Sequence, residues 1–317
     1  MHAVFLDWES IDNQDLDRQC LQDLPVDWTF HGATQPGQLA SRLEGQTIVV
    51  SNKVVLDAAI LHTAPEVQLI CVAATGTNNV DLPTATQRGI PVCNVRGYAT
   101  PSVVQHVFML ILNLLRRLPN YQQALRDGRW QHSEHFCFLD YTIEELTGKT
   151  LGIVGFGELG QAVAHMAEHF GMRVLVAQRL HGTAQAGRVP LPELLPQVDV
   201  LSLHCPLSEE TRGLLGEHEL NLMKASAVLI NTARGGIIDE PALLDALRHG
   251  RLGGAGIDVL QTEPPREGNI LLQYALPNLI VTPHIAWASR QARQRLLDGV
   301  ARNIQAYLNG QSRNRVN

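Results

Sequence analysis

The feature that most constrains the fold of this chain is a glycine-rich turn that joins an apolar strand to a helix pattern. Residues 151–160 read Leu-Gly-Ile-Val-Gly-Phe-Gly-Glu-Leu-Gly, and apolar side chains continue at helical spacing from Ala162. In such a turn Gly155 permits the tight bend, Gly157 lets a pyrophosphate approach the backbone, and Gly160 lets helix and strand lie close together. The helix N-terminus adds free N–H groups and a partial positive charge. The pattern therefore predicts a dinucleotide site at Gly155, Gly157, Glu158, Leu159 and Gly160.

Short β-branched runs alternate with helical patterns along most of the chain. The strands expected in the first hundred residues are 3–6, 47–50, 67–73 and 90–95, with helices such as 56–62 and 82–88 between them. A long helix is expected to begin near Pro101 and to run to about Arg117. Strands are then expected at 151–154, 173–177, 200–203, 227–230, 254–259 and 279–281, with a last helix at about 289–308. This alternation predicts an α/β fold, one lobe with a parallel sheet followed by a nucleotide-type lobe.

The composition suggests a folded, mildly acidic protein and excludes several classes. A chain of 317 residues suggests two domains, and 45% of its residues are hydrophobic. With 25 Lys and Arg against 31 Asp and Glu, the net charge is −6, so no basic surface for nucleic acid or anionic lipid is expected. The longest apolar stretch, 103–115, contains Gln105, His106 and Asn113 and is too short to span a bilayer.

The cysteines, the histidines and the N-terminus predict a cytoplasmic protein without a metal site. The five cysteines are far apart and form no Cys-x-x-Cys motif, which is typical of reduced thiols. His132 and His135 have an i, i+3 spacing, but no third ligand is evident, so no metal is expected. The chain begins without Lys or Arg and soon reaches Asp7, which argues against a secretory signal.

Reactive side chains follow three apolar strands of the second lobe, at the edge where open α/β sheets bind ligands. Arg234 stands between a strand and two glycines, and its guanidinium suits a substrate carboxylate, although a surface arginine is the alternative. His284 follows Pro283 at the end of another strand, and Asp258 and Glu263 follow a third. A carboxylate bonded to the imidazole would make His284 a general acid for carbonyl reduction. The spacing leaves open whether Asp258 or Glu263 is that carboxylate.

The residues after the second strand of the nucleotide-type lobe bear on the choice of cofactor. An acid there accepts a hydrogen bond from the ribose 2′-OH and repels a 2′-phosphate, but this chain has Gln178 and Arg179. Gln178 lacks the repulsion and Arg179 offers a cation, with His181 or Arg188 as further contributors. We therefore expect NAD(P)H as the cofactor, with NADPH preferred over NADH. The alternative is that Arg179 is a solvated surface residue.

Seven segments follow one another in a characteristic order and spacing: Ser51–Leu56, Ala74–Leu82, Val92–Tyr98, Glu145–Gly157, Leu203–Leu207, Asn231–Gly236 and Thr282–Ser289. Together they resemble the NAD(P)-dependent D-2-hydroxyacid dehydrogenases, in particular the glycerate dehydrogenase or hydroxypyruvate reductase branch. The similarity covers nearly the whole chain, and the order of the segments is more specific than any one of them.

The resemblance implies a role for each candidate residue. It implies that Arg234 binds the 2-oxo acid, that His284 is the acid/base, and that Glu263 is the carboxylate that holds His284. The substrate would be bound by Arg234, His284 and the backbone N–H groups of a loop formed by Thr75, Gly76, Thr77 and Asn78. Beyond the glycine turn, the cofactor would be lined by Gln178, Arg179, His204, Cys205, Pro206, Thr211, Thr232, Ala233, Asp258 and His284.

The resemblance also implies a domain organisation that the periodicity does not indicate. A flavodoxin-like substrate domain would comprise residues 1–99 and 284–317, with a Rossmann-type dinucleotide domain of residues 100–283 inserted in it. Both would be doubly wound parallel-sheet domains, and the nucleotide domain would form a homodimer. Gln105 stands where many members have Glu, which we interpret as tolerated variation.

These expectations favour reduction of hydroxypyruvate- or glyoxylate-type 2-oxo acids to D-2-hydroxy acids, with NAD(P)H as hydride donor and His284 as proton donor. The alternative is a dinucleotide-sensing, non-catalytic protein of the same fold, against which the Arg, Glu and His set argues. Formate dehydrogenases need no proton donor, and a phosphoglycerate dehydrogenase is disfavoured because no regulatory domain follows the last helix. The preferred substrate among hydroxypyruvate, glyoxylate and pyruvate stays open.

Overall fold

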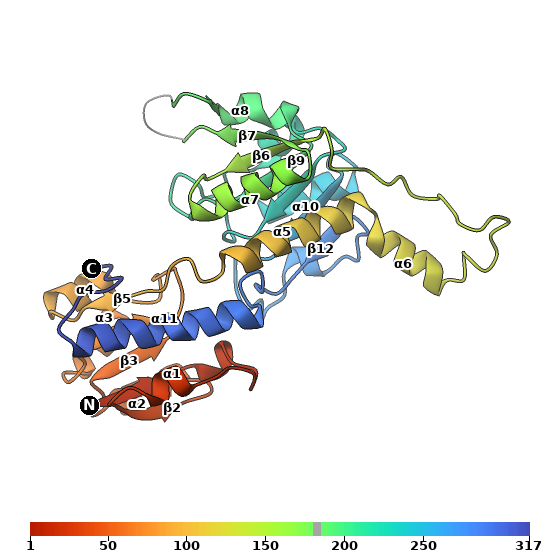
Figure 1. Cartoon of the computed structure of the whole chain (residues 1–317). Coiled ribbons are helices and arrows are strands. Elements are labelled where there is room, and N and C mark those ends of the chain that lie inside the picture. Colours follow the sequence, from red (N-terminus) through yellow and green to blue (C-terminus); the bar gives the residue numbers. More distant parts are fainter. Residues whose placement is uncertain (180–184) are drawn as a thin grey trace. The chain divides into compact units, whose positions relative to one another are not determined.

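The computed structural model describes residues 1–179 and 185–317. Contacts within the chain divide it into two compact units, each with its own parallel sheet (Figure 1). Unit 1 comprises Met1–Ala99 and Trp287–Asn317, and unit 2 comprises Thr100–Ala286. In the described ranges, no helix combines the length and the apolarity that crossing a membrane requires.

Unit 1 contains a five-stranded parallel sheet in the order β2-β1-β3-β4-β5, which is the flavodoxin-like order. Its strands are β1 (His2–Phe5), β2 (Asp27–Phe30), β3 (Ile48–Ser51), β4 (Leu69–Val72) and β5 (Val92–Cys93). Its helices are η1 (Trp8–Ser10), α1 (Gln19–Gln22), η2 (Pro36–Gln38), α2 (Leu39–Leu43), α3 (Ala58–Thr63), α4 (Leu82–Gln87) and α11 (Arg290–Leu308).

The central strands and the helix starts of unit 1 follow from local sequence. Every residue of β3 and β4 is buried, because helices cover both faces of the sheet and only apolar runs fit there. Two aspartates start the helices that follow these strands. Asp57 accepts a hydrogen bond from the Ile60 N–H of α3, and Asp81 accepts one from the Thr84 N–H of α4. Both carboxylates therefore lie at the carboxyl edge of the sheet.

Unit 2 contains a seven-stranded parallel sheet in the order β12-β11-β10-β9-β6-β7-β8. Its strands are β6 (Thr150–Val154), β7 (Arg173–Ala177), β8 (Arg188–Val189), β9 (Val200–Leu203), β10 (Val228–Asn231), β11 (Gly254–Ile257) and β12 (Leu279–Val281). This is the Rossmann order with one strand added at the β12 edge. The order reverses between β6 and β9, and ligands of open α/β sheets bind at the carboxyl ends of strands next to such a point.

Helices cover both faces of the unit 2 sheet. One face is covered by α5 (Thr100–Leu115) and α7 (Glu158–His169), and the other by α8 (Leu191–Leu194), η3 (Leu195–Gln197), α9 (Glu217–Leu222) and α10 (Glu240–Arg248). The remaining helices are α6 (Leu118–Arg126) and η4 (Ile270–Leu272). Gly256 in β11 allows close approach of α5, since a Cβ there would lie 2.9 Å from the Leu110 Cβ.

The structure corrects the sequence analysis at several elements. The helix expected to run to about Arg117 ends at Leu115, because Arg117 has a left-handed backbone (φ 55°), after which the unexpected α6 begins. The unexpected strands β2 and β8 are edge strands without a continuous apolar run. The junction expected between residues 283 and 284 lies after Ala286, because Asp258 of unit 2 accepts hydrogen bonds from the Ile285 and Ala286 N–H groups.

Candidate active site

The glycine turn between β6 and α7 lies against the segment that follows β9. Gly155 has φ 90°, and a Cβ there would lie 2.5 Å from the Cys205 backbone nitrogen. A Cβ on Gly160 would lie 2.1 Å from the Gly155 carbonyl oxygen. Neither position therefore accepts a side chain. Gly157 differs, because no described atom beyond its chain neighbours lies within 4 Å of the place its Cβ would take.

The N-terminus of α7 has the features of an anion site. No side chain of the described residues caps it at Gly157, so the first N–H groups of the helix face the open side of the turn. Glu158 is exposed and accepts a hydrogen bond from the Thr100 hydroxyl, and Leu159 is half-buried. The turn therefore offers backbone N–H groups and an unobstructed glycine face.

The first two side chains after β9, His204 and Cys205, are uncharged in the folded chain. Burial lowers the pKa of His204 to about 4, so its imidazole is neutral. His204 Nε2 lies 2.8 Å from the Ser202 hydroxyl, while Nδ1 is buried without a partner among the described residues. Burial also raises the pKa of the Cys205 thiol. The Thr211 hydroxyl donates to the Pro206 carbonyl at 2.7 Å and so closes this loop.

The turn after β10 projects Arg234 into solvent. The Asn231 side chain accepts from the Ala233 N–H at 3.0 Å and donates to the Arg234 carbonyl at 2.9 Å. A Cβ on Gly235 would lie 1.8 Å from the Leu260 carbonyl oxygen, so only glycine allows this approach to the segment after β11. The exposed Arg234 guanidinium donates to the Ala233 carbonyl at 2.7 Å. Its remaining N–H donors are available to a ligand.

These strand ends fit a dinucleotide. Thr232 Oγ1 after β10 and His204 Nδ1 after β9 are buried without partners in the part of the chain that the structure describes. Buried polar atoms normally have a hydrogen-bond partner, and a bound ligand is one source of it. Together with the open face of Gly157, they lie at the carboxyl ends of β6, β9 and β10, where a dinucleotide binds in this fold.

The segment after β12 brings His284 to Glu263. His284 Nδ1 lies 2.6 Å from Glu263 Oε2, and Glu263 Oε1 accepts from the Leu260 N–H at 2.8 Å. The side chains of His284 and Glu263 are 27% and 32% exposed, so a ligand can reach the imidazole. His284 has φ 55°, an uncommon conformation for histidine, and its N–H donates to the Asp258 carbonyl at 2.8 Å.

Of the two acids that the sequence leaves open, Glu263 contacts the imidazole and Asp258 holds the backbone around it. Asp258 is 1% exposed, and it accepts from the Thr282 hydroxyl at 2.5 Å and from the Ile285 and Ala286 N–H groups at 2.9 Å. Its carboxylate is therefore enclosed by the loop that carries His284.

Two positioning residues escaped the sequence analysis. Glu240 at the start of α10 is 8% exposed and accepts from the Gln261 N–H and the Asn269 side chain, each at 2.7 Å, which ties α10 to the segment that carries Glu263. His106 on α5 lies 3.0 Å from the Thr282 hydroxyl, and burial lowers its pKa although Asp258 opposes the shift. An acid in a first helical turn and a polar break in an apolar helix are ordinary patterns, so neither indicated this role.

The end of β7 carries the residues expected to select the cofactor. The half-buried Gln178 donates its backbone N–H to the Val189 carbonyl at 2.8 Å, and Arg179 is exposed. No acid stands at either position. His181 lies outside the described residues.

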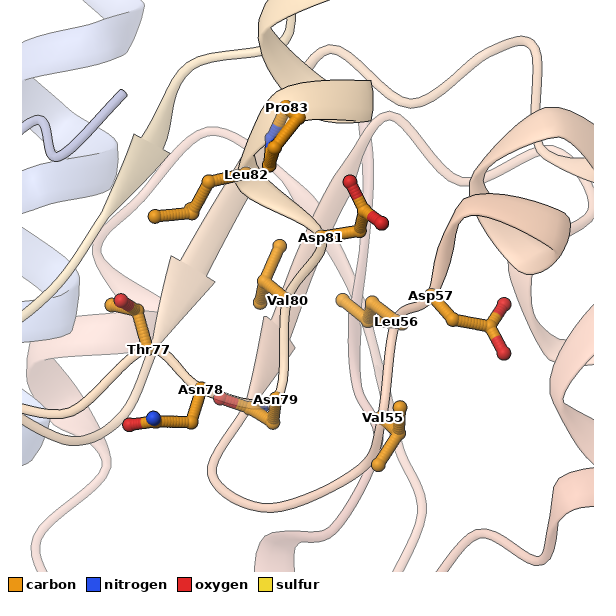
Figure 2. A pocket seen from close by; sticks show the side chains of 10 residues that line it. All are labelled: Val55, Leu56, Asp57, Thr77, Asn78, Asn79, Val80, Asp81, Leu82 and Pro83. Atoms are coloured by element: carbon orange, nitrogen blue, oxygen red, sulfur yellow. The ribbon is translucent and has the colours of Figure 1, made fainter. Parts of the chain in front are cut away.

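The predicted substrate loop of unit 1 follows β4 and is tied to the segment that follows β5. The Thr75 hydroxyl donates to the Val95 carbonyl at 2.9 Å, and the Thr75 carbonyl accepts from the Asn94 side chain at 2.7 Å. Thr77 and Asn78 line a hollow of about 510 Å³ within unit 1. Figure 2 shows that its lining comes from two segments, 55–57 before α3 and 77–83, which ends in the first two residues of α4.

A Rossmann-type unit whose strand ends carry a glycine turn, an exposed arginine and an accessible carboxylate–imidazole pair belongs to the class of dinucleotide-dependent oxidoreductases. Within the described residues, no group of three His, Cys, Asp or Glu is placed to hold a metal ion. The chemistry of this class is hydride transfer, in which a protein group handles the proton.

Comparison with known proteins identifies the family. Residues 108–286 match the model of the D-isomer specific 2-hydroxyacid dehydrogenase, NAD binding domain. The chain is 45% identical over 315 residues to glycerate dehydrogenase from Methylorubrum extorquens, covering 99% of this chain and 98% of that protein. It is 36% identical over 323 residues to hydroxypyruvate reductase from Blautia hydrogenotrophica, covering 100% of both. The structure of the TT0316 protein from Thermus thermophilus superposes with a TM-score of 0.88 at 37% identity, covering 100% of both chains.

The chain therefore belongs to the D-isomer-specific 2-hydroxyacid dehydrogenases and is an enzyme that uses a nicotinamide dinucleotide. The resemblance inferred from the sequence, the α/β fold class and the preference for an enzyme over a non-catalytic sensor are confirmed.

Proposed function

We propose that this enzyme reduces hydroxypyruvate- and glyoxylate-type 2-oxo acids to D-2-hydroxy acids, with D-glycerate formed from hydroxypyruvate. The names of the two full-length relatives above support this substrate class. The observation that carries the proposal is the contact of 2.6 Å between His284 Nδ1 and Glu263, a carboxylate–imidazole pair suited to general acid catalysis.

We assign the proton transfer to His284. Glu263 accepts a hydrogen bond at Nδ1 and fixes the ring, and Nε2 then donates its proton to the carbonyl oxygen of the substrate. The reduced nicotinamide, when bound, supplies the hydride for the carbonyl carbon. Asp258 and Glu240 hold the two backbone segments that carry this pair.

We assign the substrate's negative charge to Arg234 and to the loop of Thr75, Gly76, Thr77 and Asn78. A guanidinium can bind a carboxylate with two parallel hydrogen bonds and can stabilise charge that develops on the carbonyl oxygen. The exposed donors of Arg234 support the first role. The hydrogen bonds of Thr75 to Asn94 and Val95, after β5, hold the loop backbone in place and support the role of the loop.

We assign cofactor contacts to the glycine turn and the strand ends described above, and we propose that NADPH is preferred over NADH. The support is Gln178, which stands where an acid would repel a 2′-phosphate, with the exposed cation Arg179 beside it.

We propose a cytoplasmic homodimer formed through unit 2. The support is an apolar surface on α6 and the segment after it, which Figure 1 shows standing away from the unit 2 sheet. Phe136 is 90% exposed and Leu139 is 80% exposed, and large apolar side chains left exposed near one another in sequence are candidates for burial in a protein interface. No nucleic-acid or membrane partner is proposed.

The proposal is tested by steady-state rates with hydroxypyruvate, glyoxylate and pyruvate, each with NADPH and with NADH, followed by chiral analysis of the products. We expect higher kcat/KM for hydroxypyruvate and glyoxylate than for pyruvate, D-products, and higher efficiency with NADPH. Binding of dinucleotide without turnover of any of the three acids would contradict it.

A further inference from the structure

An arginine that begins β8 reaches across the end of β7 to the glycine turn. The Arg188 guanidinium carbon lies 4.8 Å from the centre of the Phe156 ring, which is part of the turn itself. Arg188 Nη1 donates to the Ala177 carbonyl, the last of β7, at 3.4 Å. Two contacts on two other elements therefore hold this cation above the carboxyl end of β7.

This is the place where a Rossmann-type unit holds the adenosine ribose. The residue after the second strand accepts a hydrogen bond from the ribose 2′-OH, and here that residue is Gln178, directly after Ala177. The bond from the Gln178 N–H to the Val189 carbonyl keeps β8 beside this position. The Arg188 cation thus lies next to the site of the 2′-OH, and Gln178 brings no negative charge to compete for it.

The geometry also suits a guanidinium as a phosphate ligand. When one flat face of the group rests on an aromatic ring, the N–H donors at its edge remain free to form hydrogen bonds in the plane. A phosphate takes two such bonds from a single arginine. Arg188 is half-buried and held in place, whereas Arg179 is exposed. Binding of a phosphate therefore costs Arg188 less side-chain conformational entropy than it would cost Arg179.

We propose that Arg188, held on Phe156, is the side chain that binds the 2′-phosphate of NADPH and sets the cofactor preference, with Arg179 in a minor role. This rests on the proposed preference for NADPH and names the residue that produces it. A charge-assisted hydrogen bond of this kind corresponds to about ten- to a hundred-fold in affinity.

The test uses two probes that differ only in the 2′-phosphate, adenosine 2′,5′-bisphosphate and adenosine 5′-monophosphate. Their Kd values are measured by calorimetry on the whole protein. The variants are Arg188→Gln, Arg179→Gln as the matched control, and Phe156→Leu, which removes the ring but leaves the arginine. Binding of the monophosphate and the thermal midpoint of each variant report whether the fold is intact.

We expect the wild-type protein to bind the bisphosphate at least about tenfold more tightly than the monophosphate. Arg188→Gln should remove most of this ratio with the monophosphate Kd unchanged, Phe156→Leu should reduce it in part, and Arg179→Gln should keep most of it. A ratio that survives Arg188→Gln, or that is lost in Arg179→Gln, would overturn the assignment to Arg188. A wild-type ratio near one would overturn the NADPH preference itself, and the assignment with it.

Discussion

The half-buried imidazole of His204 should couple the stability of unit 2 to pH. Burial lowers its pKa to about 4, whereas an unfolded chain holds a histidine near 6.5. Between these values the unfolded chain binds a proton that the folded chain does not, so stability rises with pH across this window. The stabilisation is complete above about pH 6.5 and is lost as the pH falls toward 4.

The size of this effect follows from the gap between the two pKa values. A gap of about 2.5 pKa units at about 1.4 kcal/mol each gives about 3 to 4 kcal/mol in total. At pH 5, partway through the window, the loss should be about 2 kcal/mol relative to pH 7.5. Other histidines and carboxylates titrate in the same range, so the quantity to measure is the difference from a variant without this imidazole.

The matched variant is His204→Gln, whose amide can still reach the Ser202 hydroxyl that bonds His204 Nε2. Urea unfolding is recorded for both proteins from pH 7.5 to 4.5 at fixed protein concentration and ionic strength. The wild-type protein should lose about 2 kcal/mol more than the variant between pH 7.5 and 5. Parallel pH dependence of the two proteins would refute the reasoning, because it would mean that the folded chain lets His204 titrate normally.

Three further substitutions test the site. Glu263→Gln keeps a hydrogen-bond acceptor but removes the negative charge beside His284. The kcat with hydroxypyruvate should therefore fall about ten- to a hundred-fold, and the Kd of NADPH should stay unchanged. An unchanged kcat would remove Glu263 from the mechanism. Arg234→Lys replaces a guanidinium, which offers two parallel N–H donors, by an ammonium that acts as a point charge. The substitution should raise KM for the 2-oxo acid and lower kcat. An unchanged kcat/KM would make Arg234 a structural residue. Glu240→Ala leaves the Gln261 N–H and the Asn269 side chain without their acceptor. It should lower the free energy of unfolding by about 1–3 kcal/mol and reduce kcat. Unaltered urea unfolding would exclude the positioning role of Glu240.

The parts of the site that are local in sequence were predictable. The glycine turn could be predicted because Gly155 allows the bend and Gly160 allows the helix to approach the strand, and both lie within a single strand–turn–helix unit. The capping residues Asp57 and Asp81 act only a few positions away along the chain. Here the physical requirement and the residues that meet it lie in one segment.

The parts that depend on contacts between distant segments were not predictable from spacing. Asp258 and Glu263 both follow β11, and only the folded chain shows that Glu263 meets the imidazole while Asp258 binds loop N–H groups. The position of Arg188 over Phe156 depends on the pairing of β7 with β8, a two-residue edge strand without an apolar pattern.

The most direct test of the central claim is the rate of hydroxypyruvate-dependent NADPH oxidation by His284→Gln at saturating concentrations of both compounds. The Kd of NADPH, measured by fluorescence, shows whether the cofactor site is intact. If His284 donates the proton, kcat should fall about 10²- to 10⁴-fold while the Kd stays at the wild-type value. A kcat close to that of the wild-type enzyme would contradict the assignment of His284 as the general acid.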